Sequence, residues 1–219
     1  MCWIVSNYVG FVKDLLKGEV FMYTSIEKSK DFAELTNFLR DFQLIEHSVN
    51  VMKLACHFAE YLQLSEKEKQ SLRVGAYVHD IGKTKIDTNI LNKPGKLTEA
   101  EFEEVKKHPL EGLFIIRKFN FINKDMWDIA IQHHERPDGK GYPFGLRDEE
   151  INPLAKIVQI CDVYDALVSK RCYKKELKKE DAILMIKDSL GTQFNKRLGT
   201  DFITFMKEYD LSQVNKFLS

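Results

Sequence analysis

An adjacent histidine and aspartate, His79 and Asp80, follow an apolar stretch and precede Gly82 and Lys83. An imidazole can ligate one metal ion and a carboxylate can bridge two, so this pair could hold a dinuclear centre. If the helix continues, Lys83 shares a face with His79 and could meet a phosphate oxygen beside the metals. Taken alone, the dipeptide is better explained as a surface His-Asp pair, because such pairs are common by chance.

A second pair of neighbouring histidines, His133 and His134, opens the string H-H-E-R-P-D-G-K-G-Y-P. Successive helical residues point about 100° apart, so the two imidazoles could serve two metals or two sides of one. A polar helix end that runs into a Gly/Pro loop would explain the two histidines by themselves. The full string, which ends in Gly141, Tyr142 and Pro143, is far more specific.

Two carboxylates, Asp162 and Asp165, lie about one helical turn apart in the apolar segment I-V-Q-I-C-D-V-Y-D-A-L. Val158 and Ala166 lie one turn on either side of Asp162, so we expect that face to be buried. A buried carboxylate needs a cation or several hydrogen-bond donors to offset its desolvation. The alternative interpretation is that Asp162 lies on the surface of the helix. Asp165 is expected to orient a ligand or to pair with Arg171.

The remaining histidines are less specific as single residues. His47 follows an apolar helix face and His108 precedes Pro109; each by itself fits a hydrogen-bonded core or surface histidine. His57 falls on a different helical face from His47, and we do not expect it to be a ligand. Together, five histidines and two aspartates supply a two-metal site of nitrogen and oxygen ligands. Because cysteine need not take part, iron or manganese fits better than a structural zinc.

The elements that must position these residues are helices. Apolar residues recur at helical spacing in five segments, at 31–44, 49–62, 125–134, 154–169 and 181–190. Capping boxes at Ser65/Glu68 and Thr98/Glu101 begin two more helices. Residues 137–153 hold three of the five prolines beside several glycines, which indicates a long structured loop. The sequence therefore predicts an all-α bundle with one long Gly/Pro loop.

The composition of the 219 residues, 44% hydrophobic and 30% charged, is typical of one globular domain with or without an extension. No window approaches the ~20 apolar residues of a membrane span, and the N-terminus does not resemble a signal peptide. Basic and acidic residues number 33 each, so we expect neither a nucleic acid polymer nor a membrane as partner. Four scattered cysteines fit free thiols in a reducing cytoplasm.

Four ordered blocks of the sequence resemble the HD-GYP branch of the HD-superfamily metal-dependent phosphohydrolases. They are H-D-I-G-K (His79–Lys83), I-L-N-K-P-G-K-L-T (Ile90–Thr98), H-H-E-R-P-D-G-K-G-Y-P (His133–Pro143) and D-V-Y-D-A-L-V-S-K-R-C-Y-K (Asp162–Lys174). The resemblance runs from about His47 to Phe205. It implies a helical HD-domain bundle that hydrolyses the bacterial second messenger cyclic di-GMP. Residues 37–219 would form this domain, and residues 1–36 a helical N-terminal extension.

The resemblance also implies roles for single residues. The metal ligands it implies are His47, His79, Asp80, His108, His133, His134 and Asp162. Lys83 matches the lysine beside the scissile phosphate, and Arg171 and Lys174 match positions that hold the nucleotide's phosphates. A glutamate that holds a third metal in some members of the family is replaced by Gln43, so we expect two metals.

This resemblance implies a two-metal mechanism. Two divalent ions, iron or manganese, ~3.5–4 Å apart would share a bridging hydroxide that attacks the phosphodiester. Asp80 and the metals would supply the nucleophile, while Lys83, Arg171 and Lys174 would offset charge on the phosphoryl oxygens.

Two alternatives stay open for the activity: a phosphohydrolase of another cyclic nucleotide or mononucleotide, and a metal-containing cyclic di-GMP receptor or adaptor with little turnover. The loop around Tyr142 either covers the site or docks a partner, such as a diguanylate cyclase-type protein. The N-terminal segment is a remnant or a helical element that forms a homodimer.

Overall fold

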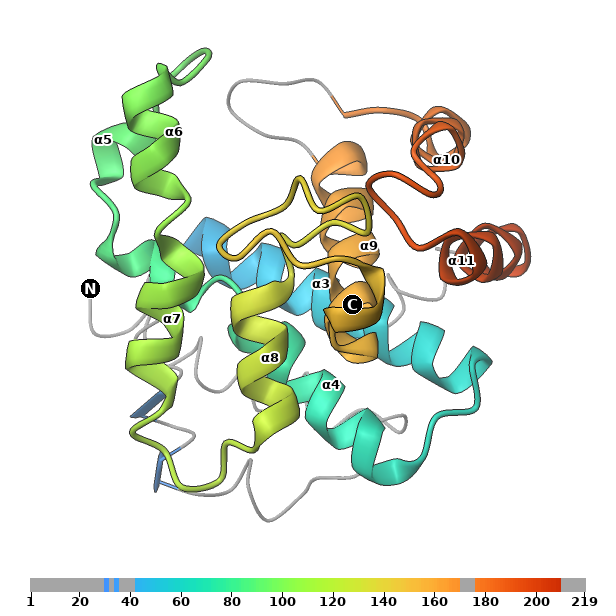
Figure 1. The fold of residues 1–219 in the computed structure, drawn as a ribbon, viewed down its shortest axis with the longest axis horizontal. Helices are drawn as coiled ribbons and strands as arrows, with labels where there is room; N and C mark the ends of the chain where they lie inside the picture. The colour runs from blue at the N-terminus through green and yellow to red at the C-terminus, as the bar shows by residue number, and fades with distance from the viewer. Residues whose placement is uncertain (1–29, 32–33, 36–41, 170–175, 210–219) are drawn as a thin grey trace.

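The computed structural model describes residues 30–31, 34–35, 42–169 and 176–209, and over these residues the chain is helical, with no β-strand (Figure 1). The predicted all-α fold is confirmed. The α-helices are α3 (Phe42–Tyr61), α4 (Glu66–Val78), α5 (Thr88–Leu91), α6 (Glu99–Val105), α7 (His108–Ile116), α8 (Lys124–Gln132), α9 (Pro153–Val168), α10 (Lys179–Asp188) and α11 (Lys196–Glu208). Two 3-10 helices, η1 (Ile81–Lys85) and η2 (Asp148–Glu150), lie between them.

Four helices, α3, α4, α8 and α9, pack against one another and bury the apolar core. Phe58 of α3, Leu72 of α4 and Ile129 of α8 are fully buried there. In Figure 1, α5 and α6 lie on one side of the molecule and α10 and α11 on the other, with the loop between α8 and α9 between them. Among the described residues, no helix is both long and apolar enough to cross a bilayer.

The predicted helix starts at residues 65 and 98 are confirmed. Ser65 accepts a hydrogen bond from the Glu68 amide and Thr98 from the Glu101 amide, and each glutamate caps in return. The predicted Gly/Pro loop is also present between α8 and α9, interrupted only by η2. The predicted boundary between residues 36 and 37 lies outside the described residues.

Other elements differ from the predicted segments. The residues between the segments 31–44 and 49–62 are also helical, because no glycine or proline interrupts the chain there and α3 runs through His47. The helices α5, α7 and α11 were not predicted, and His108 begins α7 instead of ending the helix that starts after Thr98. The start of α11 carries a usable signal, since the Asn195 side chain accepts a hydrogen bond from the Leu198 amide.

The helix that precedes His79 does not continue to Lys83, as the sequence analysis had considered. The helix α4 ends at Val78, and the tighter helix η1 follows Asp80. The helix α7 packs closely against η1: a Cβ atom on Gly82 would lie 1.9 Å from the carbonyl oxygen of His108 and 2.4 Å from the amide nitrogen of Gly112. Only a glycine lets these two backbones pack so closely.

We expect Gly82→Ala to lower the free energy of unfolding by about 1–3 kcal/mol or more, because the added methyl group must push α7 away from η1. The matched control is Gly112→Ala, on the other side of the same contact. Its Cβ would lie 3.4 Å from the Gly82 amide nitrogen, an ordinary contact. Chemical denaturation of both variants measures the difference, and equal stability would contradict the proposed close approach.

Candidate metal centre

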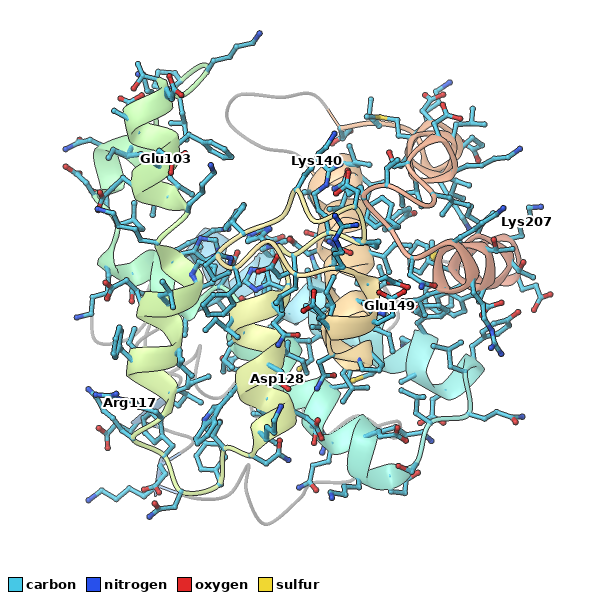
Figure 2. All side chains as sticks on the ribbon, in the orientation of Figure 1. Glu103, Arg117, Asp128, Lys140, Glu149 and Lys207 are labelled. Carbon is cyan, nitrogen blue, oxygen red and sulfur yellow. The ribbon has the colours of Figure 1, made fainter. Side chains whose placement is uncertain are left out.

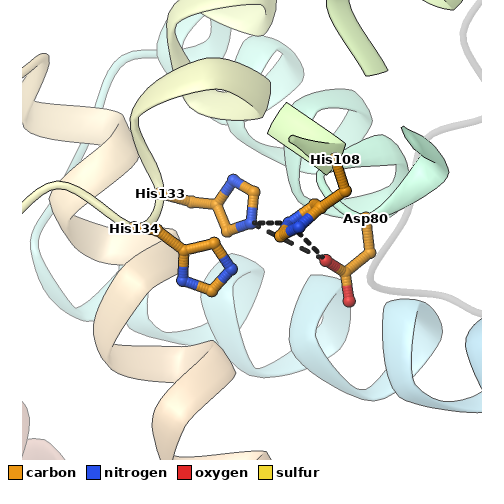
Figure 3. A group of neighbouring side chains, drawn as sticks. All are labelled: Asp80, His108, His133 and His134. Atoms are coloured by element: carbon orange, nitrogen blue, oxygen red, sulfur yellow. Dashed lines mark hydrogen bonds and ion pairs between the residues drawn. The ribbon is translucent and has the colours of Figure 1, made fainter. Parts of the chain in front are cut away.

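Side chains from several helices meet around Asp80, and Figure 3 shows this carboxylate beside His108, His133 and His134. Two groups of candidate ligands share Asp80. One group is Asp80, His108, His133 and His134, and the other is His47, His79 and Asp80; within each group the ligand atoms lie within 4.8 Å of one another. Asp162 is 2.9 Å from His47 and 3.9 Å from His79.

Most of these residues stand at the ends of helices. His79 ends α4, His108 begins α7, and His133 directly follows α8. Pro109 suits the first turn of α7, where its missing N–H is not needed. His47 and Asp162 instead project from the interiors of α3 and α9. The adjacent residues His133 and His134 both belong to the group that contains His108, instead of each belonging to a different group.

Three imidazoles are each held by a backbone carbonyl. The Nδ1 atoms of His79, His108 and His133 lie 2.7, 2.7 and 3.0 Å from the carbonyl oxygens of Ala76, Val105 and Ala130, each three residues earlier. A carbonyl only accepts, so each Nδ1 carries the proton and donates it. Each Nε2 therefore presents a lone pair toward the centre of the site.

The two oxygens of the Asp80 carboxylate face different imidazoles. Oδ1 lies 3.3 Å from His108 Nε2 and 3.7 Å from His133 Nε2. Oδ2 lies 3.6 Å from His47 Nε2 and 3.5 Å from His79 Nε2. Each oxygen of this carboxylate therefore faces its own pair of imidazoles.

His47 is oriented by a carboxylate instead of a backbone carbonyl. Its Nδ1 lies 2.6 Å from Asp165 Oδ2, and its Nε2 lies 2.9 Å from Asp162 Oδ1. Asp165 in turn accepts a hydrogen bond from the Ser169 hydroxyl at 3.0 Å. A carboxylate that holds the far nitrogen of a histidine is a common way to aim it at a metal. The orienting role predicted for Asp165 stays a prediction.

Burial and charge shift the pKa values of these groups in opposite directions. Burial lowers the pKa of His79 to about 4 and also lowers those of His108 and His134, so these rings are neutral at pH 7. Burial would also lower the pKa of His47, but the adjacent carboxylates of Asp162 and Asp165 raise it to about 9. A cation that binds there must therefore displace a proton.

The two aspartates are ionised. Burial acts to raise the pKa of Asp80, but the adjacent ammonium group of Lys83 holds it well below its usual range. Burial likewise opposes ionisation of Asp162, and His47 outweighs it. Two buried carboxylates therefore stay charged, which needs compensating positive charge close by.

These residues fit a metal centre because several of their buried nitrogen and oxygen atoms have no hydrogen-bond partner. In the described part of the chain, His79 Nε2 and Asp80 Oδ1 are buried and make no hydrogen bond. The Nε2 atoms of His108 and His133 lie 3.3 Å apart, with lone pairs facing each other. Acceptors that face acceptors repel unless a cation lies between them. Nitrogen and oxygen ligands without cysteine suit borderline and hard divalent ions.

Lys83 reaches back to the site from η1. Its ammonium group donates to Asp80 Oδ2 at 2.5 Å, although the continuous helix considered for it is absent. Arg171 and Lys174, predicted to hold phosphates, lie outside the described residues, as does the side chain of Gln43. His57, which was not expected to be a ligand, lies in neither group and contacts Tyr209 instead, with the ring centroids 5.2 Å apart.

The Gly/Pro loop is fastened beside the metal centre by Glu135, a role that the sequence analysis missed. This fully buried carboxylate accepts hydrogen bonds from the amides of Phe144 at 2.6 Å and Leu146 at 2.9 Å. A Cβ on Gly141 would lie 2.4 Å from the Glu135 Cα, so the loop folds tightly over this residue. In the sequence, the glutamate of the H-H-E string was the available signal for this role.

Tyr142 is thereby placed on the metal centre. Its ring stacks on His134 with centroids 4.7 Å apart and planes at 26°. A cleft of about 330 Å³ opens here, and its lining includes His133, His134 and Tyr142 together with Lys140 of the loop (Figure 2) and Gln193. The cleft gives a ligand access to one side of the ligand set.

Chelation of the metal is expected to lower the melting temperature by about 5–10 °C, because ions that bind only the folded state stabilise it. Differential scanning fluorimetry with and without a chelator measures the shift, and added Mn²⁺ should reverse it. An Asp80→Ala variant is the control, since it should not respond to the chelator. A wild-type protein equally insensitive to chelation would count against the metal centre.

Asp165→Ala is expected to weaken metal binding about 10–100-fold, because the ring of His47 loses the carboxylate that orients it. Titration of the metal-free protein with Mn²⁺ measures the affinity. Ser169→Ala, which removes only a donor to Asp165, should change it less than about threefold. Similar affinities for the two variants would show that Asp165 does not position His47.

The chain is similar in sequence to several known phosphodiesterases. A cyclic di-GMP phosphodiesterase of Pseudomonas aeruginosa, PA4108, is 42% identical over 137 residues, which are 63% of this chain and 33% of that protein. A cyclic di-GMP phosphodiesterase of Thermotoga maritima is 37% identical over 179 residues, 80% of this chain and 49% of that protein. The 3'3'-cGAMP-specific phosphodiesterase 3 of Vibrio cholerae is 35% identical over 146 residues, 67% of this chain and 32% of that protein.

A solved structure shares the fold. Bd1817, an HDG"Y"P protein from Bdellovibrio bacteriovorus, superposes with a TM-score of 0.63 at 25% identity, covering 75% of this chain and 52% of that one. The chain spans about a third to a half of the length of the three curated relatives above. The model of the HD domain family matches residues 35–198. With this match over most of its length, the chain belongs to the HD-domain family.

Proposed function

We propose that this chain is a metal-dependent phosphodiesterase that hydrolyses cyclic di-GMP at the site around Asp80. The observation that carries the proposal is the Asp80 carboxylate, whose two oxygens face two different sets of imidazoles. Relatives that are 42% and 37% identical are named cyclic di-GMP phosphodiesterases, which supports this substrate.

Two divalent ions, iron or manganese, would be held by the ligands described above. His108, His133 and His134 would hold one, His47, His79 and Asp162 the other, and Asp80 both. When bound, such ions polarise the phosphodiester and lower the pKa of water. The backbone carbonyls that accept from Nδ1 keep three of the rings aimed at the ions, so little reorganisation is needed.

The cationic residues would neutralise the substrate. The Lys83 ammonium group, already beside Asp80, would offset the negative charge that grows on the phosphoryl oxygens. Arg171 and Lys174 would hold the phosphates, as the motif resemblance implies. Since the Tyr142 ring packs on His134, the loop would cover one side of the site and limit the access of water.

The same loop would also offer a docking point for a protein partner such as a diguanylate cyclase. Phe144, next to the Tyr142–Pro143 pair, is 58% exposed although it is large and apolar. Tyr142 itself packs against the site, so Phe144 is the aromatic side chain of the loop that a partner would meet.

A second candidate substrate is a hybrid cyclic dinucleotide, because one relative is named as specific for 3'3'-cGAMP. Both candidates use the same metal site and differ only in the bases. A substrate panel containing both cyclic dinucleotides separates them by their kcat/KM values.

The test is turnover by the protein loaded with iron or manganese under reducing conditions. Wild-type protein should cleave cyclic di-GMP, and His133→Ala should lower kcat by at least about 1,000-fold, because it removes a ligand at the reacting centre. His57→Ala is the matched histidine control and should keep its activity. Tight binding of cyclic di-GMP without any product would refute the enzyme and favour the receptor interpretation.

A further inference from the structure

One wall of the cleft comes from α6, a helix that contributes no residue to the candidate metal centre. Phe102 and Lys106, one helical turn apart, line the same cleft as His133 and His134. In Figure 1 this helix lies on the opposite side of the loop from α10. The α6 wall, defined here as Phe102 and Lys106, therefore borders the space that a ligand of the metals would enter.

The position of Phe102 is not explained by packing of the core. The side chain is 45% exposed and is not part of the buried cluster. Its nearest aromatic neighbour is Tyr142, met edge to face, with centroids 6.4 Å apart and planes at 82°. An aromatic ring that lines a cleft while half exposed offers a flat apolar face to a ligand.

Lys106 places a positive charge next to both rings. Its ammonium nitrogen lies 4.9 Å from the centroid of Phe102 and 6.0 Å from that of Tyr142, and it pairs with Glu103 at 2.6 Å. Glu103, labelled in Figure 2, is 60% exposed, so this ion pair is weak and easily exchanged. The side chain of Lys106 is therefore free to turn its donors toward a ligand.

A line of rings connects the α6 wall to the metal centre. Phe102 contacts Tyr142, which stacks on His134 with centroids 4.7 Å apart. A nucleotide carries a flat base at one end and a phosphate at the other. A nucleotide whose phosphate lies at the metals therefore has the rings of Phe102 and Tyr142 within the same cleft.

We propose that the α6 wall is the surface that recognises a guanine base of the substrate. Phe102 stacks on the base, and Lys106 donates to its O6 and N7 atoms. Guanine presents two acceptors on this edge, whereas adenine presents one acceptor and an amino donor, which a lysine cannot satisfy. This inference rests on the proposed function, because it places the phosphate of the same nucleotide at the metals.

Binding to the metal-loaded protein tests the stacking without requiring turnover. GMP and ribose 5-phosphate share the phosphate and the sugar and differ in the base. Calorimetry should show that wild-type protein binds GMP more tightly than ribose 5-phosphate. Phe102→Ala should weaken GMP binding about 5–100-fold and leave ribose 5-phosphate unchanged, whereas Phe102→Trp should keep GMP binding.

The chain offers a matched control for the ring. Phe114 of α7 is 50% exposed and has the Arg117 guanidinium 4.9 Å from its centroid, as Phe102 has Lys106, but it does not line the cleft. Phe114→Ala should leave the affinity for GMP unchanged. Equal losses in the two variants would mean that exposed aromatic residues affect binding only through stability.

The role of Lys106 is tested by the preference for GMP over AMP. Lys106→Ala should reduce this preference about tenfold, the loss expected for a contact to a base edge. Lys107→Ala is the control, since Lys107 makes the same kind of ion pair, with Glu104, but does not line the cleft. If cyclic di-GMP is cleaved, both α6 variants should raise KM more than they lower kcat.

Three results would overturn the inference. They are a wild-type protein that binds GMP no more tightly than ribose 5-phosphate, a Phe102→Ala variant that loses both ligands equally, and a Lys106→Ala variant with an unchanged preference. A wild-type protein that discriminates GMP but cleaves nothing would refute the proposed phosphodiesterase while leaving base recognition by α6 in place.

Discussion

The structure of the site depends on one buried carboxylate that must remain charged. Asp80 is fully buried, and imidazole nitrogens from four helices or helix ends face its two oxygens. Three of those imidazoles are committed by their Nδ1 bonds to present lone pairs, so they cannot neutralise the aspartate by themselves. Lys83 supplies one positive charge, and bound cations would supply the remainder. The arrangement therefore fits a site that binds divalent metal ions.

The bundle is arranged to bring helix ends to that carboxylate. The end of α4, the start of α7 and the end of α8 carry His79, His108 and His133, so their distance from Asp80 is set by how closely these helices pack. The closest approach is at Gly82, where the backbone of α7 occupies the space of a side chain. Core packing and metal geometry are therefore coupled: a shift of α7 would also move His108.

The cleft joins this rigid centre to a more exposed rim. Glu135 holds the loop from its buried side through two backbone amides, and so fixes Tyr142 on His134. The opposite rim is the α6 wall, where Phe102 is 45% exposed and contacts Tyr142, and Lys106 pairs with the surface residue Glu103. The residues of the centre suit chemistry that every member of a phosphodiesterase class would share. The residues of the rim are free to differ with the base that is bound.

The sequence alone determined the helical class and two capping boxes, because these depend on residue type and on local spacing. Helical periodicity indicated that Asp162 is buried, and the family resemblance implied His47 and His108 as ligands although neither was specific by itself. The sequence did not determine the end of α4 before Asp80, the placement of His133 and His134 in one group, or the role of Glu135. These features depend on contacts between separate segments of the chain. The helix α7 packs against Gly82, two sets of imidazoles surround one carboxylate, and the loop folds back so that its amides donate to Glu135 at its start. Local spacing does not indicate which surfaces contact each other, so only the tertiary structure determined these three features.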